Sequence, residues 1–316
     1  MKILILSNHI AALPAIHAFH EKGWLLGTLT FAIPADKNKM KYFCDLKGIV
    51  CYQMIDDKSF YEQLADLLNA TCADLVLVFG FSKKIPSSLL QIPPLGFFNV
   101  HFSLLPAYRG PEPLFWQIKR GESFTGVTVH KMDESFDGGP ILFQQRVPLF
   151  AEENFGSLNS RLSLLSVNVI DHALSKLMHG EAGLQLQDES GAFALPSVKA
   201  FDVAINWEEH TAAEIMNLVN ACNPIYAGAA TLFRGQEITI VEVSPAIIND
   251  MDGHEPGTVV YVDGNYGLFV ACKHAGFLRI NVVQTTEGIL SGYKLIALGV
   301  KAGDRFTTSG QYETLS

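Results

Sequence analysis

The sequence predicts an α/β protein with a doubly wound, mostly parallel sheet and a smaller β-rich domain at its C-terminal end. The first observation is that short apolar runs typical of buried strands alternate with segments of helical periodicity in the first half of the chain. The second is that short β-rich runs separated by glycines follow one another after residue 229. The third is size: 316 residues, of which 48% are hydrophobic and 17% charged, suffice for two domains.

The first half of the chain contains four apolar runs that predict parallel strands, at residues 2–7, 25–31, 49–52 and 75–79. Helical spacing of Leu13, Ile16 and Phe19 predicts a helix that ends at Gly23. A second helix is predicted from the stripe Phe60, Leu64, Leu67 and Leu68, and the polar segment 36–47 is predicted to be partly helical. No Gly-x-Gly-x-x-Gly follows the first strand, so the sequence does not indicate a dinucleotide site.

The stretch 97–149 carries the residues that suggest chemistry. The run 96–101 predicts a buried strand, on which Asn99 and His101 share one face because side chains alternate along a strand. A loop containing prolines and glycines follows, then a helix at 113–121 and strands at 125–132 and 141–149. Asp137 lies between those two strands, in Asp137-Gly138-Gly139-Pro140.

Asn99, His101 and Asp137 suit acyl transfer to an amine, in which the amine itself is the nucleophile. Asn99 can donate to a developing oxyanion, and His101 can donate to it or relay a proton. Asp137 can orient His101, favour its charged form and help to take the proton from the amine. The glycines after Asp137 let the backbone pass close to a neighbouring strand. Residue types alone also fit a purely structural His–Asp pair, and His130 is predicted to be a packed or edge histidine.

Five sequence blocks in this order resemble the folate-dependent formyltransferases: Asn99-x-His101, Ser103-Leu104-Leu105-Pro106, Tyr108-Arg109-Gly110, Thr125-Gly126-Val127-Thr128 and Asp137-Gly138-Gly139-Pro140. That family includes methionyl-tRNA, glycinamide ribonucleotide and sugar-nucleotide N-formyltransferases. The resemblance implies a Rossmann-like catalytic domain in which Asn99, His101 and Asp137 are catalytic and 10-formyltetrahydrofolate is the formyl donor.

The resemblance also implies where the substrates bind. The folate pocket is expected between two loops and the segment before Asp137, and the residues of the loops are Phe81, Ser82, Lys83, Lys84, Ile85, Ser103, Leu104, Leu105 and Pro106. The first loop is expected to act largely through main-chain groups, and the side chains of Lys83 and Lys84 are predicted to be an ordinary solvated pair. The acceptor is expected near Asn8, His9 and Arg109, since Asn8 and His9 follow the first strand, at the edge where open α/β sheets bind ligands.

The second half of the chain is expected to form a helix, a linker and a barrel. Apolar positions from Leu158 to Leu177 predict a long helix that ends at Gly180. The domains are predicted as 1–180 (catalytic), 181–207 (linker) and 208–316, which begins with a helix at 211–221. Strands are predicted at 229–233, 237–243, 257–262, 268–272 and 278–283, and resemblance to the same family makes this domain OB-like.

Composition excludes several classes of function. The net charge of −9 argues against a general DNA-binding or anionic-membrane surface. The five cysteines show no Cys-x-x-Cys and are predicted to be buried thiols, and no cluster has the spacing of metal ligands. No apolar run reaches about 18 residues, so no membrane span is predicted. The first residues predict a strand and not a signal peptide, and we expect a cytoplasmic protein.

The acceptor is the open question. A basic insertion usual in methionyl-tRNA formyltransferases is short here, and residues 208–316 contain 6 Lys and Arg against 12 Asp and Glu. A tRNA-binding domain should be basic. The sequence therefore favours a small primary amine, such as an amino-sugar nucleotide or an amino acid derivative, as the acceptor. The alternatives are initiator methionyl-tRNA, then water in a formyltetrahydrofolate hydrolase, then a folate-binding protein without turnover.

Overall fold

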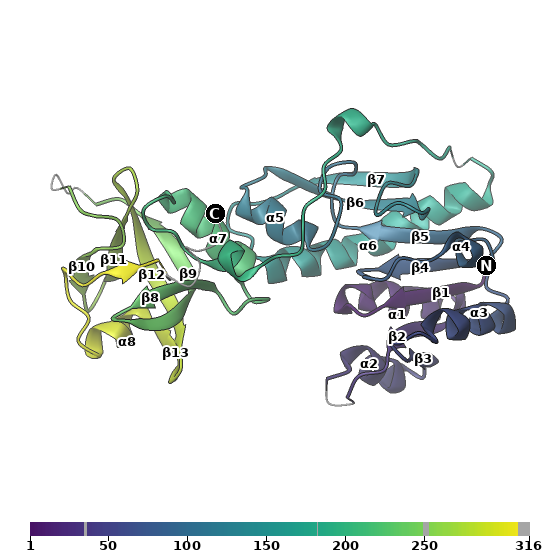
Figure 1. Ribbon diagram of the computed structural model, residues 1–316, viewed down its shortest axis with the longest axis horizontal. Helices are drawn as coiled ribbons and strands as arrows, with labels where there is room; N and C mark the ends of the chain where they lie inside the picture. Colours follow the sequence, from purple (N-terminus) through teal and green to yellow (C-terminus); the bar gives the residue numbers. More distant parts are fainter. Residues whose placement is uncertain (35–36, 182, 249–252, 309–316) are drawn as a thin grey trace. The chain divides into compact units, whose positions relative to one another are not determined.

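A computed structural model describes residues 1–34, 37–181, 183–248 and 253–308. The chain divides into two compact units, which alternate along the sequence (Figure 1). The first comprises Met1–Pro113, Phe124–Pro148 and Asn159–Pro196, and the second comprises Leu114–Ser123, Leu149–Leu158 and Ser197–Ser316. Asp36, which begins the predicted polar segment, and the last residues of the predicted C-terminal domain lie outside the described residues.

The first unit contains a sheet of seven strands in the order β3-β2-β1-β4-β5-β6-β7. The strands are β1 (Ile3–Ser7), β2 (Leu25–Phe31), β3 (Cys51–Met54), β4 (Leu75–Phe79), β5 (Gly96–His101), β6 (Phe124–Lys131) and β7 (Ile141–Pro148). Neighbours from β3 to β5 pair in parallel, whereas β6 pairs antiparallel with both β5 and β7. The predicted doubly wound, mostly parallel sheet is therefore confirmed.

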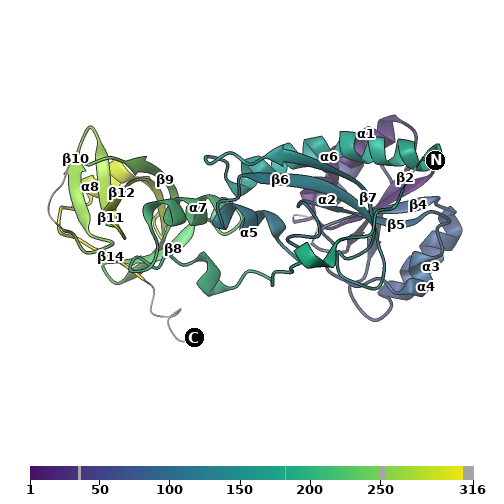
Figure 2. The same ribbon diagram turned by 90° about the horizontal axis from the view of Figure 1, so that it is seen from above.

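Helices cover both faces of this sheet. They are α1 (Leu13–Glu21), α2 (Lys39–Lys47), α3 (Phe60–Thr71), α4 (Ser87–Leu90) and α6 (Phe155–Met178), whose first residues belong to the second unit. Figure 2 shows α1 and α6 on one face and α3 and α4 on the other. Because side chains alternate along a strand, Leu4 and Leu6 of β1 pack in the core beneath α3, together with Phe60 and Leu64. This two-sided burial explains why the central strands are continuous apolar runs.

In the first unit, the predicted element boundaries differ from the structure around α2, and in the second unit β9 and β12 extend beyond the predicted ranges 237–243 and 278–283. Asn38 caps the start of α2 by accepting from the amide of Lys41, and Gly48 ends it with a φ of 68°. Ile49 still bonds back to Cys44 of the helix, so β3 begins at Cys51 and not at residue 49 as predicted. The short helix α4 was not predicted, since four residues are too few to show a helical period.

The second unit is built on an antiparallel sheet. The strands are β8 (Ala229–Phe233), β9 (Gln236–Ala246), β10 (Val259–Asp263), β11 (Gly267–Cys272), β12 (Gly276–Thr285), β13 (Gly288–Ser291) and β14 (Phe306–Thr307). Their order is β10-β11-β12-β9-β8-β14, with β13 beside β12. A bridge between Thr258 and Arg305, which precede β10 and β14, joins the ends of the sheet as in a barrel.

Helix α7 (Ala212–Cys222) begins with a capping box in which Thr211 and Glu214 bind each other's backbone amides. A further helix of this unit, α5 (Pro113–Lys119), lies between β5 and β6 in sequence. Sequence analysis missed β13, β14 and α8 (Gly292–Ala297), which are short and carry no clear period.

The five cysteines are free thiols. Cys44, Cys222 and Cys272 are buried as predicted, and Cys51 is half-buried. The prediction is wrong for Cys72, which is exposed because it terminates α3 in the left-handed conformation, with a φ of 48°. Among the described residues, no helix is both long and apolar enough to cross a membrane.

Candidate active site

Strands β5 and β6 bring the predicted catalytic side chains together. In the antiparallel register between them, Asn99 lies opposite His130, and His101 lies opposite Thr128. Directly opposed residues place their side chains on the same face of the sheet. His101 and His130 are only 6% and 2% exposed. The site is therefore built on two opposed residue pairs on one face of the sheet, with both imidazoles shielded from water.

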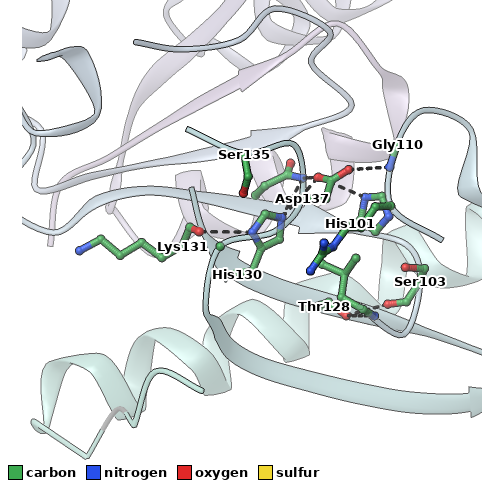
Figure 3. A network of polar contacts seen from close by, with 12 residues as sticks. His101, Ser103, Gly110, Thr128, His130, Lys131, Ser135 and Asp137 are labelled. Carbon is green, nitrogen blue, oxygen red and sulfur yellow. Dashed lines mark hydrogen bonds and ion pairs between the residues drawn. The ribbon is translucent and has the colours of Figure 1, made fainter. Parts of the chain in front are cut away.

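The carboxylate of Asp137 is the centre of this site (Figure 3). Its Oδ1 accepts a hydrogen bond from Asn99 Nδ2 at 3.0 Å and lies 3.7 Å from His101 Nδ1 and 3.5 Å from His130 Nε2. Its Oδ2 accepts from the Gly110 amide at 2.9 Å. The structure thus brings together all three residues that the sequence predicted to be catalytic.

A backbone carbonyl determines that Nε2 of His101 carries a proton. Its Nε2 lies 2.8 Å from the carbonyl oxygen of Tyr108. A carbonyl only accepts, so Nε2 carries a proton and donates it. The remaining nitrogen, Nδ1, faces the carboxylate of Asp137.

Two opposing effects act on the pKa of Asp137. Burial alone would raise the pKa of this carboxyl, because burial penalises the charged form. The positive charge of His101, the hydrogen bond with His130 and the Gly110 amide outweigh burial, and together they hold the pKa of Asp137 well below its usual range. Asp137 is therefore a carboxylate at neutral pH and a weak base.

The backbone around Asp137 requires its two glycines. Asp137 itself adopts a φ of 54°, in the left-handed region. A Cβ on Gly138 would lie 2.5 Å from Ser135 Oγ, and one on Gly139 would lie 1.9 Å from the carbonyl oxygen of Lys131. Only glycine allows the loop to approach the end of β6 this closely. The sequence prediction of a close approach at these glycines is confirmed.

The loop after β5 is held in place by hydrogen bonds of side chains that are buried or half-buried. Ser103 is fully buried, and its hydroxyl donates to the carbonyl of Ala107 at 2.8 Å. Thr128 Oγ1 donates to the Ser103 carbonyl at 2.6 Å, and Gln144 Nε2 donates to the Leu105 carbonyl at 3.0 Å. The side chains of Ser103 and Leu105 thus support the loop from inside, whereas Leu104 and Pro106 are half-buried. Contact between this loop and a folate stays a prediction.

The other predicted folate loop is only partly available to a ligand. Ile85 belongs to the core, and the ring of Phe81 packs against those of Phe31 and Phe60. Lys84 is exposed, as predicted. The prediction that Lys83 is solvated is wrong: its ammonium pairs with Asp56 and lies 5.1 Å from the ring centre of Phe60. Sequence analysis could not foresee this, because Asp56 lies before α3 and Phe60 is the first residue of that helix, both far from Lys83 in sequence.

Asn8 and His9 line a cavity of about 400 Å³ together with Ser82, Phe31 and Lys37. Asn8 Oδ1 accepts from the Phe31 amide at 2.9 Å, and His9 Nδ1 accepts from the Ala11 amide at 3.2 Å. Burial lowers the pKa of His9, so its ring is neutral at pH 7. The structure therefore joins two predicted acceptor residues and one predicted folate residue around one pocket.

A second cavity, of about 410 Å³, lies between the segment around α4 and residues 131–134, the segment that leads to Asp137. Leu90, Gln91 and Met132 are among its lining residues. Sequence analysis expected part of the folate pocket at the segment before Asp137.

Arg109 does not reach the cavity around Asn8. Its guanidinium donates to Gln187 Oε1 at 2.8 Å and, with two nitrogens, to Glu189 at 2.7 and 3.0 Å. Arg109 is therefore engaged by the segment predicted to be a linker. A role in binding the acceptor stays a prediction.

Sequence analysis missed two residues of the site, His130 and Gln187. His130 Nε2 lies 3.2 Å from Asn99 Nδ2, and its Nδ1 lies 3.3 Å from the carbonyl of Lys131. Alternation along β6 puts His130 on the same face as Thr128, but only the register with β5 places it beside Asn99. Gln187 contacts the Asp137 loop from a segment without periodicity, so alternation along an element could not place it there. Among the described residues, no group of three or more His, Cys, Asp or Glu side chains is placed to hold a metal.

Two family models match the chain. The model described as formyl transferase matches residues 14–174, and the model described as formyl transferase, C-terminal domain, matches residues 198–296. Together they cover most of the chain, including every residue from Asn99 to Asp137.

Relatives and solved structures match over both regions. The methionyl-tRNA formyltransferase of Syntrophus aciditrophicus is 38% identical over 248 residues, which are 76% of this chain and 76% of the relative. That of Carboxydothermus hydrogenoformans is 33% identical over 77% of this chain and 79% of the relative. A structure of the N-formyltransferase from Helicobacter canadensis in complex with folinic acid and dTDP-3-aminofucose superposes with a TM-score of 0.65 at 14% identity, over 88% of this chain and 98% of that one.

Proposed function

The chain belongs to the formyl transferase family, and from this premise we propose that it transfers a formyl group from 10-formyltetrahydrofolate to the amino group of methionyl-tRNA. The observation that supports methionyl-tRNA as the acceptor is the similarity to methionyl-tRNA formyltransferases at 33% and 38% identity, over about three quarters of each chain. This likeness outweighs the charge argument, so methionyl-tRNA takes precedence over the small amine that sequence analysis favoured.

The residues of the site fit a formyl donor. Transfer of a formyl group needs a hydrogen-bond donor for the formyl oxygen and a polar group for the proton of the amine, and it needs no nucleophile from the protein. Asn99, His101 and Asp137 supply such a set: Asp137 Oδ1 lies 3.0 Å from Asn99 Nδ2 and 3.7 Å from His101 Nδ1. The bound folinic acid of the Helicobacter canadensis enzyme supports a reduced folate as the donor here. That donor supplies an activated formyl group.

In the proposed mechanism, Asn99 Nδ2 and the protonated His101 Nδ1 stabilise negative charge as it develops on the formyl oxygen. Asn99 is held for this by Asp137, and His101 by the Tyr108 carbonyl at its other nitrogen. Preorganised donors of this kind lower the barrier because they need not reorient during the reaction. The amine attacks as the neutral species, since an ammonium has no lone pair.

Asp137 acts mainly through its charge. A carboxylate whose pKa is held well below its usual range is a poor final acceptor for a proton. It does stabilise positive charge on His101 and on the attacking nitrogen, and it keeps the ring of His101 in place. We therefore assign the proton transfer to His101. Its Nδ1 proton goes to the departing nitrogen of the formyl donor as the carbon–nitrogen bond breaks, and the proton lost by the attacking amine replaces it, with Asp137 favouring the charged imidazole.

A small primary amine is the second candidate for the acceptor. The specific observation is the charge of the C-terminal segment: residues 208–316 contain 6 Lys and Arg against 12 Asp and Glu. Three of those six cations, Arg234, Lys273 and Arg305, pair with carboxylates of the same segment. Such pairing reduces the positive charge that this segment can offer to phosphates.

The test is a formylation assay with 10-formyltetrahydrofolate and two kinds of acceptor, methionyl-tRNA and a panel of amino-sugar nucleotides and amino acid derivatives. We expect formylmethionyl-tRNA as the main product, measured by acid-gel separation and by mass spectrometry of the released formylmethionine. The His101→Ala variant is the control for contaminating activity. Formylation of a small amine with methionyl-tRNA unchanged would replace the first candidate by the second.

A further inference from the structure

A segment of the predicted linker lies against both loops that hold the catalytic carboxylate. We call residues 185–195 the strap. At its start, Gln185 exchanges two backbone hydrogen bonds of 2.8 Å with Ile141, just after the Asp137 loop. At its end, the Arg109 amide donates to the Phe193 carbonyl and the Leu195 amide donates to the Arg109 carbonyl, both at 3.0 Å. The strap therefore ties together two loops that are far apart in sequence.

Gln187 is the side chain of the strap that contacts the Asp137 loop directly. Its Nε2 donates to the carbonyl oxygens of Asp137 and Gly139, each at 2.7 Å. Its Oε1 accepts from Arg109 Nε at 3.1 Å and Nη2 at 2.8 Å. An amide has two N–H donors and two oxygen lone pairs, so this side chain is fully satisfied.

These partners also fix which end of the amide points where. Carbonyl oxygens only accept, so Nε2 must face Asp137 and Gly139; a guanidinium only donates, so Oε1 must face Arg109. The reversed amide would place Oε1 against two carbonyl oxygens and its NH2 group against the N–H donors of Arg109. Gln187 thus joins the two loops in one orientation only.

Each loop tied in this way carries a partner of the catalytic side chains. The loop with Arg109 supplies the Tyr108 carbonyl that accepts from His101 and the Gly110 amide that donates to Asp137. The other loop contains Asp137, whose φ of 54° is unfavourable for a residue with a Cβ. Such a conformation persists where neighbouring contacts enforce it, and Gln187 binds the carbonyl of that very residue.

We propose that Gln187 is a positioning residue, which holds the Asp137 carboxylate at its distance from Asn99, His101 and the Gly110 amide by binding the backbone on both sides of Gly138. This proposal rests on the catalytic role given to Asp137 under the proposed function. Glu189, the other strap residue on Arg109, binds the guanidinium through both carboxylate oxygens and is 71% exposed. It provides a matched control.

The experiment compares Gln187→Glu, Gln187→Met and Glu189→Gln with the unchanged chain. Glutamate keeps the shape of Gln187 but has no donor for the two carbonyls, and methionine removes the polar group without adding charge. We would measure kcat and KM for methionyl-tRNA formylation, and the hydrogen exchange of the Gly110 amide by NMR. The exchange rate reports the contact with Asp137 Oδ2 and needs no substrate.

Both Gln187 variants are expected to lower kcat by about 10- to 100-fold, as small displacements of catalytic groups do, with KM within about twofold of the original. Their Gly110 amide should exchange at least about tenfold faster, whereas Glu189→Gln should change neither quantity by more than about twofold. The melting temperature of each variant establishes that it is folded. Methionine is chosen because it fits the half-buried position of Gln187 without adding a charge.

Unchanged protection of Gly110 in both Gln187 variants would overturn the positioning role, and so would an equal loss in Glu189→Gln. The proposed function fails separately: if the unchanged chain makes no formylmethionyl-tRNA, the acceptor is wrong. The Gly110 exchange rates then still decide whether Gln187 holds Asp137.

Discussion

At the residue scale, the amide of Asn99 is already oriented before any substrate arrives. Its nitrogen lies 3.0 Å from Asp137 Oδ1 and 3.2 Å from His130 Nε2. His130 Nε2 also lies 3.5 Å from Asp137 Oδ1, so a proton on Nε2 is directed to that carboxylate, and the second amide proton of Asn99 is left for the formyl oxygen. The amide nitrogen, and not the oxygen, then faces the polar centre of the site.

Removing a proposed oxyanion donor should lower turnover strongly. For Asn99→Ala and for His101→Ala we expect kcat to fall by on the order of 10²–10³, since each change removes a donor that acts on developing charge. KM for the formyl donor should change much less. Single-turnover formylation at saturating donor measures this directly. Turnover within a few-fold of the original would exclude the changed residue from the chemistry.

His130 should matter less than its neighbours, because it acts on Asp137 and not on the substrate. We expect His130→Ala to lower kcat by about tenfold, which corresponds to the loss of one hydrogen bond worth about 1 kcal/mol. The comparison variant is His130→Gln, whose amide nitrogen can donate to Asp137 and should recover part of the rate. A variant His130→Ala with full activity would show that Asp137 alone orients Asn99.

At the scale of elements, the backbone of the turn between β6 and β7 leaves no room for a side chain at Gly139. We expect Gly139→Ala to destabilise the protein by about 1–3 kcal/mol, because a Cβ would lie 1.9 Å from the Lys131 carbonyl and the backbone must move. Urea unfolding followed by circular dichroism measures the change. The control is Gly183→Ala, because no atom lies close to a Cβ at that position. Gly180→Ala is unsuitable, because Gly180 has a φ of 70°. Equal stability of the Gly139 and Gly183 variants would contradict this account.

The turn after β1 should make stability depend on pH through His9. Burial lowers the pKa of His9 in the folded protein below the value of about 6.5 expected when the chain is unfolded. The neutral ring also accepts from the Ala11 amide, which a ring protonated at both nitrogens cannot do. The contribution of His9 is therefore complete above about pH 6.5 and is lost as the pH falls through the lowered pKa.

The unfolding free energy at pH 7.5 and 5.5 tests this, with His9→Gln as the control. Glutamine cannot titrate but can still accept a hydrogen bond. The unchanged chain should lose more stability between the two pH values than the variant does. The same loss in both proteins would place the effect elsewhere, for instance at His210, whose pKa burial also lowers.

At the scale of the whole molecule, the charge balance should limit how strongly salt affects tRNA binding. A protein with 6–10 phosphate contacts loses about 10³–10⁵ in affinity between 50 and 200 mM salt. With a net charge of −9 and a C-terminal segment poor in Lys and Arg, this chain should lose only about tenfold. Filter binding of methionyl-tRNA at the two concentrations measures the slope. A loss of 10³ or more would mean that a basic surface exists despite the overall charge.

The sequence by itself determined the sheet and the identity of the central side chains. Strands β2, β4, β5 and β8 have the bounds that their apolar runs predict, because a strand buried on both faces has to be apolar throughout. The alternation along β5 put Asn99 and His101 on one face, and the motif blocks pointed to Asp137. The roles of these residues stay predictions until turnover is measured.

Only the tertiary structure decided which residues complete the site. His130 meets Asn99 through the register of β5 against β6, and a shift of one residue in that register would turn it to the other face. Lys83 is drawn from solvent by Asp56, and Ser103 is enclosed by the loop that follows it. Gln187 reaches Asp137 from a segment that has no periodicity. Contacts between residues distant in sequence leave no local pattern, because they depend on how the chain returns to itself.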